Sequence, residues 1–489
     1  MKKIVLLMFG LVLAIPTWAQ DDPAFFDYFY DATMRIDYYH TGDSQEEQIS
    51  LDKIYRSDTW AGSVTRLIDE YNQGRHYIRI FDKESGALIF SRGYDSIFGE
   101  YQTTNAAALG IDRTYHESAL IPYPKDSFFF TVYARNADNA LYEIFRQEID
   151  PEDVNIINEK PDADIQVIKE HISGNVHEKV DVLFVAEGYT TEESEKVRSD
   201  LKKFSDILFK YEPFKSHKND FNIYGVFKPS DESGVDEPTH GSFKNTAVSA
   251  SFNSLGSPRY LLTEDNKALR DVASAAPYDA IYVMVNHDRY GGGGIYNLYC
   301  TFTTDNQWYE YLFIHEFGHS FSGLADEYYT SSTAYNDFYP RGIEPTERNI
   351  TALLDPSELK WEELAAKNIE VPTPWNKAEF DSMDMAYQQV RGDLNDQIAK
   401  LKRQGAPTSE VKPLEEKSER LSKEHADKVE EWLKNSKYYN KVGAYEGAGY
   451  SSEGLYRPEI DCIMFTKGKK PFCDVCQSAI NDVIGFYTE

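Results

Sequence analysis

The first third of the chain alternates apolar runs with short segments rich in turn-forming residues. The runs "HYIRIF" (76–81) and "ALIFSR" (87–92) flank "DKESG", and the runs "SFFFTVYA" (127–134) and "LYEIFRQEI" (141–149) flank "RNADN". Pairs of runs joined in this way are typical of β-hairpins. We therefore predict an N-terminal β-sandwich domain over residues 20–160, which ends in an acidic linker with two prolines.

The pattern changes at residue 165. "VDVLFVAEGYT" (180–190) is typical of a buried strand, the charged and periodic stretch 192–210 of a helix, and "FNIYGVFKPS" and "DAIYVMVNH" of two further strands. Strand–helix–strand order predicts an α/β layer. We thus expect an α+β multidomain protein whose second domain covers residues 165–489.

Residues 385–437 form two charged runs on either side of "QGAPTSE". The apolar positions at helical spacing are Leu394, Ile398 and Leu401 in the first run, and Leu414, Leu421, Val429 and Leu433 in the second. This spacing predicts a helical hairpin inserted into the second domain. The hairpin would either decorate the surface or gate a cleft.

The chain begins "MKKIVLLMFGLVLAIPTWAQ", with two lysines, an apolar run from Ile4 to Pro16 and small residues before Ala19. This order predicts a secretory signal peptide at residues 1–19. The apolar run is shorter than the roughly 20 residues that span a bilayer. We expect export to the periplasm, the surface or the surroundings of a bacterial cell, and no transmembrane segment.

Composition narrows the classes of function. Hydrophobic residues make up 41% of the chain and aromatic residues 14%, which is enough for a packed core. The formal net charge of −30 repels phosphate backbones and anionic lipid. We therefore expect a protein or peptide partner and no nucleic acid.

The stretch "IHEFGHSFSGLADEYY" (314–329) carries the chemistry. Within a helix predicted at residues 306–322, His315 and His319 are four residues apart and so share one face. Two imidazoles placed in this way can bind Zn²⁺, and Glu316 can act as the general base for a metal-activated water. The pattern predicts peptide hydrolysis without a covalent intermediate.

Zinc in a catalytic site usually takes a third protein ligand. In the pattern H-E-x-x-H-x-x-G-x-x-H the turn glycine and the third ligand would fall at Ser322 and Ala325, so that pattern fails. Shifted by one residue, it places a glycine at Gly323 and a carboxylate at Asp326. We predict Asp326 as the third ligand, with its neighbour Glu327 as the alternative.

Two residues in the segment "GLYRPEIDCIMF" are further candidates. Met464 is suited to a Met-turn, in which a methionine lies beneath the metal, although a single Met is also common in a core. Tyr456 is a candidate for stabilising the oxyanion of the reaction.

The chain has four cysteines, which are Cys300, Cys462, Cys473 and Cys476. The C-x-x-C pair at the C-terminal end lacks the second pair that a zinc ribbon requires. We expect a local disulfide between Cys462 and either Cys473 or Cys476.

The metal motif, together with "EGYT" (187–190), "SGVDEP" (233–238), "YGGGGIYN" (290–297) and "YRPEIDCIMF…FCDVC", resembles the secreted IgA metallopeptidase family. This group of metzincin-like zinc peptidases is common in gut bacteria. The resemblance covers most of residues 180–489. It implies a β-sandwich ahead of a metzincin-like catalytic domain, zinc held by His315, His319 and Asp326, and host or gut proteins such as immunoglobulin as substrates.

In metzincin-like folds, the strand before the active-site helix is a sheet edge that pairs with extended substrate. The matching segment here is Gly292, Gly293, Gly294 and Ile295. Its glycines would allow a substrate backbone to approach closely, or would form a flexible loop between strands.

Three functions fit these observations. The first is a secreted zinc endopeptidase, and the second is a non-catalytic glycan- or protein-binding protein with a structural zinc site. The third is an amidase that acts on small or cell-wall peptides. An intact Glu316 between two metal ligands favours an enzyme.

Overall fold

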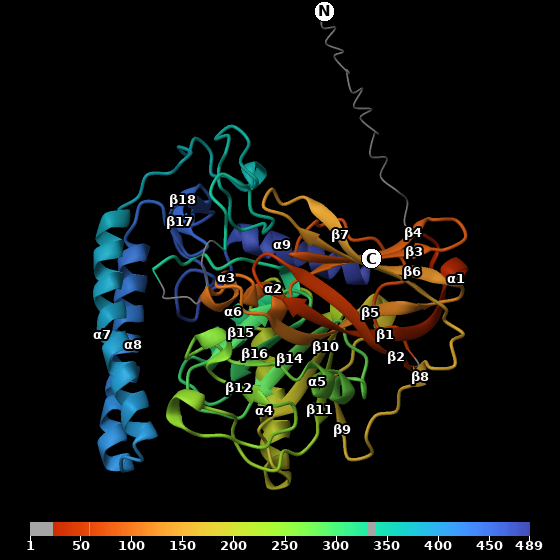
Figure 1. Ribbon diagram of the computed structural model, residues 1–489. Helices are drawn as coiled ribbons and strands as arrows, with labels where there is room; N and C mark the ends of the chain where they lie inside the picture. The colour runs from red at the N-terminus through yellow and green to blue at the C-terminus, as the bar shows by residue number, and fades with distance from the viewer. Residues whose placement is uncertain (1–22, 58, 331–337) are drawn as a thin grey trace, which may run out of the picture.

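The computed structural model describes residues 23–57, 59–330 and 338–489, and the expected signal peptide lies outside these ranges. The N-terminal part contains two four-stranded sheets, with strand orders β5-β1-β2-β8 and β4-β3-β6-β7 (Figure 1). The first consists of β1 (Phe29–Gly42), β2 (Glu47–Ser57), β5 (Arg113–Pro124) and β8 (Ile157–Asn158). The second consists of β3 (His76–Asp82), β4 (Leu88–Tyr94), β6 (Phe128–Arg135) and β7 (Leu141–Ile149).

The two predicted hairpins are confirmed, since β3 pairs with β4 and β6 pairs with β7, both antiparallel. Side chains from both sheets, among them Ile36 and Phe130, belong to one buried core. The segment expected to be a linker returns to this part of the molecule, because β8 pairs with β2. Three short helices complete it, which are α1 (Phe25–Tyr28), α2 (Ile97–Tyr101) and α3 (Asn105–Ala108).

A six-stranded sheet of order β15-β16-β14-β10-β11-β9 forms the centre of the second part. Its strands are β9 (Gln166–His171), β10 (Val180–Glu187), β11 (Phe221–Phe227), β14 (Ala280–Val285), β15 (Gly292–Ile295) and β16 (Tyr299–Thr303). The four inner strands are parallel, and β9 and β15 are antiparallel edge strands. This arrangement confirms the predicted α/β layer.

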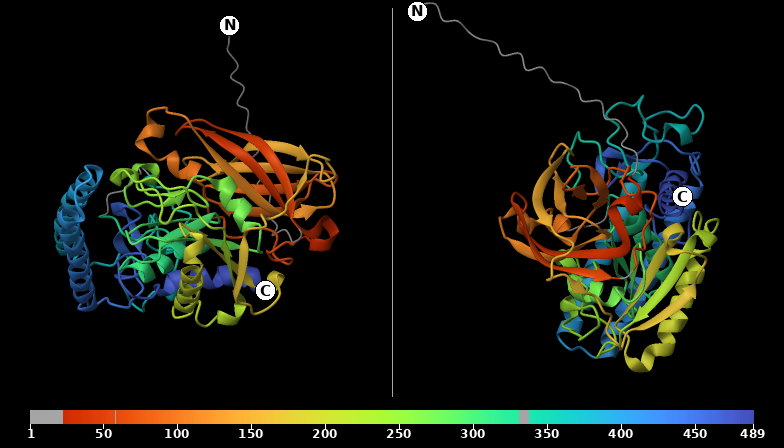
Figure 2. Two further views of the ribbon diagram at one scale, coloured as in Figure 1. Left: turned by 90° about the horizontal axis from the view of Figure 1, so that it is seen from below. Right: turned by 90° about the vertical axis from the view of Figure 1, so that its right-hand side faces the viewer.

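Both faces of the sheet are covered, which explains why β10 is buried along its whole length. On one face, Phe184 of β10 packs in a core with α4 (Ser194–Leu208) and α6 (Tyr309–Ser322). On the other face, Val185 packs in a core with α5 (Asn266–Ala273) and with α2 of the N-terminal part. Figure 2 shows the N-terminal sheets lying against this second side.

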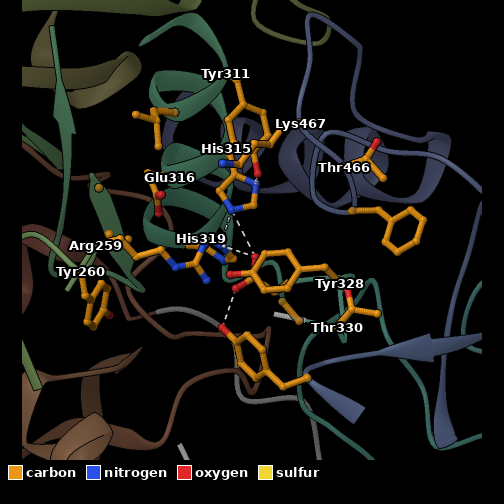
Figure 3. A pocket seen from close by; sticks show the side chains of 18 of the residues that line it. Arg259, Tyr260, Tyr311, His315, Glu316, His319, Tyr328, Thr330, Thr466 and Lys467 are labelled. Carbon is orange, nitrogen blue, oxygen red and sulfur yellow. Dashed lines mark hydrogen bonds and ion pairs between the residues drawn. The ribbon is translucent and has the colours of Figure 1, made fainter. Parts of the chain in front are cut away.

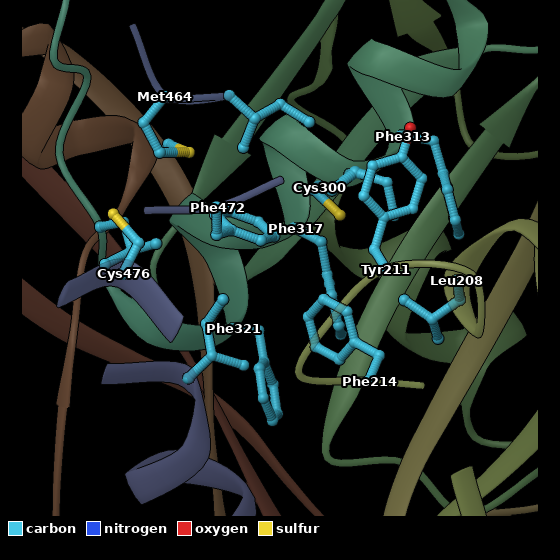
Figure 4. Close-up of a cluster of buried hydrophobic side chains, with 14 of the residues drawn as sticks. Leu208, Tyr211, Phe214, Cys300, Phe313, Phe317, Phe321, Met464, Phe472 and Cys476 are labelled. Carbon is cyan, nitrogen blue, oxygen red and sulfur yellow. The ribbon is translucent and has the colours of Figure 1, made fainter. Parts of the chain in front are cut away.

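Helix α6 is fixed by aromatic side chains along its rear face (Figure 4). Tyr282 of β14 stacks on Phe313 and Phe317, with ring centroids 4.5 and 4.7 Å apart, and Phe317 stacks on Phe321 at 4.9 Å. These phenylalanines repeat every four residues and so share one face of the helix. The opposite face is left to carry His315 and His319.

The predicted helical hairpin is present, but its first helix starts earlier than expected. It consists of α7 (Lys377–Arg403) and α8 (Thr408–Lys434), which lie side by side at one edge of the molecule (Figure 1). The early start is explained by Phe380, which is buried in the same core as α6. Val429 and Leu433 of α8 join that core, whereas Leu394, Ile398 and Val411 form a separate small cluster between the helices.

The remaining elements are β12 (Ala250–Ser251), which pairs with β13 (Leu262–Thr263), the hairpin of β17 (Tyr445–Ala448) and β18 (Ser451–Arg457), and the C-terminal α9 (Asp474–Thr488). Among the described residues, none of the helices has the length and apolar character needed to cross a membrane.

Candidate active site

Helix α6 ends in a turn that brings the chain back towards its own histidines. Gly323 adopts a left-handed conformation with φ of 59°, and its N–H donates to the carbonyl of His319 at 2.9 Å. The N–H of Leu324 donates to the carbonyl of Gly318 at 3.1 Å. This pair of bonds is a glycine-dependent helix end. Because the chain reverses here, Asp326 lies against the helix face that carries His315.

The side chains of His315, His319 and Asp326 converge. The two Nε2 atoms are 3.2 Å apart, and Asp326 Oδ1 lies 3.1 Å from Nε2 of His315 and 3.2 Å from Nε2 of His319. A tetrahedral ion with bonds of about 2.0–2.1 Å would separate its ligand atoms by about 3.3–3.4 Å. The three atoms are therefore spaced as zinc ligands are, on residues that sequence spacing predicted.

The outward-facing atoms of these three side chains are each held by a neighbour. Nδ1 of His315 is 3.0 Å from the carbonyl oxygen of Ile463, and Nδ1 of His319 is 2.5 Å from that of Leu324. A carbonyl can only accept, so both Nδ1 atoms carry hydrogen, and in the neutral form of each ring the Nε2 lone pair faces the centre. Tyr450 donates its hydroxyl to Asp326 Oδ2 at 2.5 Å.

This arrangement leaves three acceptor atoms facing one another. Among the described residues, the buried Asp326 Oδ1 receives no hydrogen bond. Burial alone would lower the pKa of His319, but Asp326 and Glu316 raise it to about 9. The site therefore favours positive charge at its centre, and its geometry fits a metal ion bound by the three residues.

Glu316 projects from the same helix towards β15. Its side chain is 8% exposed, and a Cβ added to Gly292 would lie 3.0 Å from its Oε1. Figure 3 shows its carboxylate beside the two histidines. Burial raises the pKa of Glu316, with His315 and His319 acting in the opposite direction. A carboxylate with a raised pKa is suited to accept and return a proton near neutral pH.

The site opens into a cavity of about 220 Å³. Tyr311, Tyr328 and Arg259 project into the same space as the histidines (Figure 3). The helical hairpin also lines the cavity, through residues of both helices: Asp384, Tyr387, Gln388, Arg391, Ser422, His425, Ala426 and Val429. The hairpin is thus part of the cavity wall, so the interpretation as surface decoration alone is wrong.

Glu327, the alternative third ligand, lies elsewhere. Neighbouring residues of an extended chain point in opposite directions, and Glu327 Oε1 is 3.3 Å from Cys476 Sγ and accepts from Asn349 Nδ2 at 3.1 Å. The structure groups it with three cysteines rather than with the histidines. This corrects the alternative and leaves Asp326 beside the histidines.

The expected disulfide is not formed. Cys462, Cys473 and Cys476 are free thiols, and Sγ of Cys462 lies 3.9 Å from Sγ of Cys476, whereas a disulfide needs about 2.05 Å. Cysteine spacing does not indicate this arrangement, because the carboxylate of Glu327 that lies beside Cys476 Sγ is 135 residues before Cys462 in the sequence.

The structure bears differently on the predictions made for Tyr456 and Met464. Tyr456 lies on β18, where its backbone bridges to Thr351, and it is not among the described residues that line the cavity. The role suggested for its hydroxyl is therefore corrected. Met464 is fully buried, and its Sδ would lie 3.0 Å from a Cβ added to Gly318 of α6. It packs against α6, and its assignment to a Met-turn stays a prediction.

The glycines of β15 are explained by packing inside the protein. A Cβ on Gly294 would lie 2.3 Å from the carbonyl oxygen of Glu316, and one on Gly293 would lie 2.5 Å from the ring of Tyr260. β15 is an edge strand, as predicted for the segment ending at Ile295, but at Gly292 it is already bridged to Tyr260. The glycines thus allow α6 and Tyr260 to approach, and they form a strand rather than a flexible loop.

The sequence analysis did not identify the residues that surround His315, His319 and Asp326. Tyr450 has a positive φ of 63°, which is unusual for a bulky side chain and is a feature of functional sites. The sequence signal was the segment "GAGYSS", whose glycines mark the tight turn between β17 and β18. Tyr328 lies within the stretch 314–329 that carries the metal motif, whereas Arg259 lies in a loop that matches none of the quoted motifs.

Comparison with known families agrees with this division of the fold. A family model described as IgA Peptidase M64 matches residues 168–484, and one described as Peptidase M64 N-terminus matches residues 24–146. No curated protein matches the chain. The first match covers more than half of the chain, including α6, the hairpin and all of the central sheet except the first two residues of β9.

Proposed function

Because the chain belongs to the IgA peptidase M64 family and is therefore a metallopeptidase, we propose that it is an exported zinc endopeptidase. The observation that carries this proposal is the convergence of His315 Nε2, His319 Nε2 and Asp326 Oδ1 to within 3.2 Å of one another. Two imidazoles and one carboxylate form a common ligand set for catalytic zinc. The position of helix α6 behind the antiparallel edge strand β15 supports a metzincin-like domain.

Zinc held by these three residues would polarise the scissile carbonyl and make a water molecule acidic near neutral pH. Glu316, as general base, accepts the proton of the attacking water and returns it to the leaving amine. Its burial against β15 supports this role, because a buried carboxylate holds a proton more readily than an exposed one. Its position also keeps it beside the metal ligands.

We assign to Tyr328 and Arg259 the stabilisation of the oxyanion that the sequence suggested for Tyr456. Both line the cavity, and the guanidinium of Arg259 lies 5.9 Å from the ring centroid of Tyr328. Burial and then Asp326 raise the pKa of Tyr328, so its hydroxyl remains a donor. Donors held in a buried cavity stabilise the oxygen that becomes negative during attack on the carbonyl.

The substrate is an extended segment of a protein or peptide. The part of β15 beyond Gly292 lines the cavity and lies at the edge of the sheet, where an added strand can pair with its backbone. The family description names IgA, so immunoglobulins and other host or gut proteins are the first natural substrates to test. Export rests on the expected signal peptide at residues 1–19.

The test uses the chain from Gln20 loaded with zinc, a mixed peptide library and mass spectrometry. The wild type is expected to cut internal peptide bonds. Glu316→Gln is expected to bind the same amount of zinc and to lose at least about 10²-fold in rate, the usual contribution of a general base. Cleavage restricted to terminal residues, or a Glu316→Gln variant as active as the wild type, would contradict the proposal.

A further inference from the structure

Four buried side chains that the proposed reaction does not use meet behind the active site. They are Glu327, Cys462, Cys473 and Cys476, and each is at most 4% exposed. One ligand atom from each, a carboxylate oxygen or a sulfur, lies within 4.8 Å of all the others. The fourth cysteine, Cys300, is also buried but does not belong to this group.

The distances within the group match a metal centre. Sγ of Cys462 and Sγ of Cys476 are 3.9 Å apart, and Glu327 Oε1 lies 3.3 Å from Cys476 Sγ and 3.9 Å from Cys473 Sγ. A tetrahedral zinc ion with bonds of about 2.3 Å to sulfur and 2.0–2.2 Å to oxygen would separate sulfurs by about 3.8 Å and sulfur from oxygen by about 3.5–3.7 Å. A disulfide fits none of these separations.

The backbone around the sulfurs is arranged to support negative charge. The N–H groups of Met464 and Cys473 point at Cys462 Sγ, at 3.4 and 3.2 Å, and the N–H of Cys476 points at Cys473 Sγ at 3.5 Å. Cys473 is the N-cap of α9, and Cys476 lies in its first turn. Thiolates are favoured at the N-terminus of a helix, and the thiolate is the form that binds metal.

The carboxylate supplies a second, independent indication of a cation. Oε1 of Glu327 accepts from Asn349, but Oε2 is buried and has no hydrogen-bond partner among the described residues. Burying a carboxylate oxygen without a compensating partner destabilises the folded state, and so does burying a cluster of thiolates. A divalent cation between the four side chains would compensate them together, and the nearby buried Arg457 adds further positive charge.

We propose that Glu327, Cys462, Cys473 and Cys476 bind a second metal ion, zinc, in a closed structural site. Four protein ligands complete a tetrahedron and leave no position for a water molecule, which distinguishes structural from catalytic zinc. Sulfur ligands favour zinc over magnesium or calcium.

A metal ion bound by Glu327 and the three cysteines would also position the site formed by His315, His319 and Asp326. Glu327 directly follows Asp326, and its N–H donates to the carbonyl of Met464 at 2.9 Å. Ile463, whose carbonyl accepts from His315, lies between Cys462 and Met464. An ion at the second site therefore ties the segment that carries Asp326 to the segment that holds His315, and to the start of α9.

The experiment measures metal content and cobalt spectra on the full chain from Gln20. Elemental analysis is expected to find about two zinc ions per chain, one of them retained in His319→Ala. Replacement of zinc by Co²⁺ is expected to produce the near-ultraviolet band of cobalt–thiolate charge transfer in the wild type and in His319→Ala. Cys473→Ser is expected to lose this band.

Cys300→Ser is the matched control, because it removes a buried cysteine outside the group and should keep both the band and the metal content. One zinc per chain in the wild type, or a Cys–Cys disulfide in the purified protein, would overturn the proposal. So would a thiolate band that disappears in His319→Ala. The inference does not depend on peptide cleavage, since the band reports thiolate ligands only and the catalytic ligands contain no sulfur.

Discussion

Tyr450 donates its hydroxyl to Oδ2 of Asp326, and this bond directs the other carboxylate oxygen at the two histidines. The contact joins residues 124 positions apart in sequence. It is reinforced by the backbone, because the N–H of Gly449 donates to the carbonyl of Asp326 at 2.9 Å and that of Tyr450 to the carbonyl of Tyr328 at 3.0 Å. The turn between β17 and β18 thus holds Asp326, the proposed third ligand, in place.

Tyr450→Phe tests this relationship. Loss of a hydrogen bond that orients a metal ligand usually weakens metal binding by about 10–100-fold. We expect that loss for zinc at the active site, measured by competition with a chelator, with a matching fall in activity at limiting zinc that added zinc restores. Tyr456→Phe is the matched control, since Tyr456 lies outside the cavity lining, and equal zinc affinities in the two variants would contradict the assignment.

Asp326→Asn and Glu327→Gln are expected to affect different ions although the residues are adjacent. Asp326→Asn removes a negatively charged ligand from the histidine site, so we expect zinc affinity there to fall by more than ~100-fold, with the cobalt–thiolate band retained. Glu327→Gln is expected to alter that band and to leave the two histidines able to bind metal. Spectral titration of both variants with Co²⁺ measures the two sites separately.

A reversed result, in which Asp326→Asn changes the thiolate band and Glu327→Gln abolishes binding by the histidines, would exchange the roles of the two carboxylates. That outcome would also reinstate Glu327 as the third ligand.

Which residues of the candidate site can be predicted from the sequence depends on how far apart they lie along the chain. His315, Glu316, His319 and Asp326 lie within twelve residues, so helix geometry and one glycine turn were enough to bring them together. Tyr450 and Ile463 reach the same side chains through tertiary contacts, and the glycines beside Tyr450 indicate a turn but not what that turn contacts. The cysteine group was misjudged for the same reason, because its fourth member is 135 or more residues away from the other three.

The fold shows a similar limit. Alternating and buried strand patterns predicted the hairpins and the α/β layer, since each follows from a short stretch of sequence. The start of α7 was missed by eight residues, because Phe380 stabilises the first turns by packing on the core and not by a heptad-like pattern.

Gly294→Ala is expected to destabilise the protein by separating β15 from α6. The new Cβ would lie 2.3 Å from the carbonyl oxygen of Glu316 and 2.8 Å from Cβ of His319, and backbone atoms cannot move aside as a flexible side chain can. Overpacking of this kind costs about 1–3 kcal/mol. Thermal unfolding should show a lower Tm together with reduced activity, because α6 carries His315 and His319, the proposed metal ligands.

The control is Gly392→Ala in the middle of α7, where an added Cβ meets no atom within 4 Å. There alanine is expected to stabilise the helix by about 0.5–1 kcal/mol. A Gly294→Ala variant with an unchanged Tm and normal activity would show that β15 and α6 are not as tightly packed as the structure indicates.

His40 makes the stability of the N-terminal part depend on pH. Its ring is fully buried, with Nε2 2.9 Å from Glu47 and Nδ1 3.2 Å from Glu117, next to His76 at a ring distance of 5.2 Å. Burial alone would lower the pKa of His40, but Glu117 and Glu47 raise it from 6.5 to about 9. The folded state thus binds a proton at pH values where the unfolded state has released it.

The stability contributed by this proton is fully present below pH 6.5 and is lost as pH rises through about 9. The free energy of unfolding falls by about 3 kcal/mol over this window. His40→Gln removes the titrating group, so the urea midpoints of wild type and variant should converge as pH rises from 6.5 to 9.5. Parallel midpoint curves for the two proteins across this range would exclude His40 as the source of the dependence, since every other titrating group is common to both.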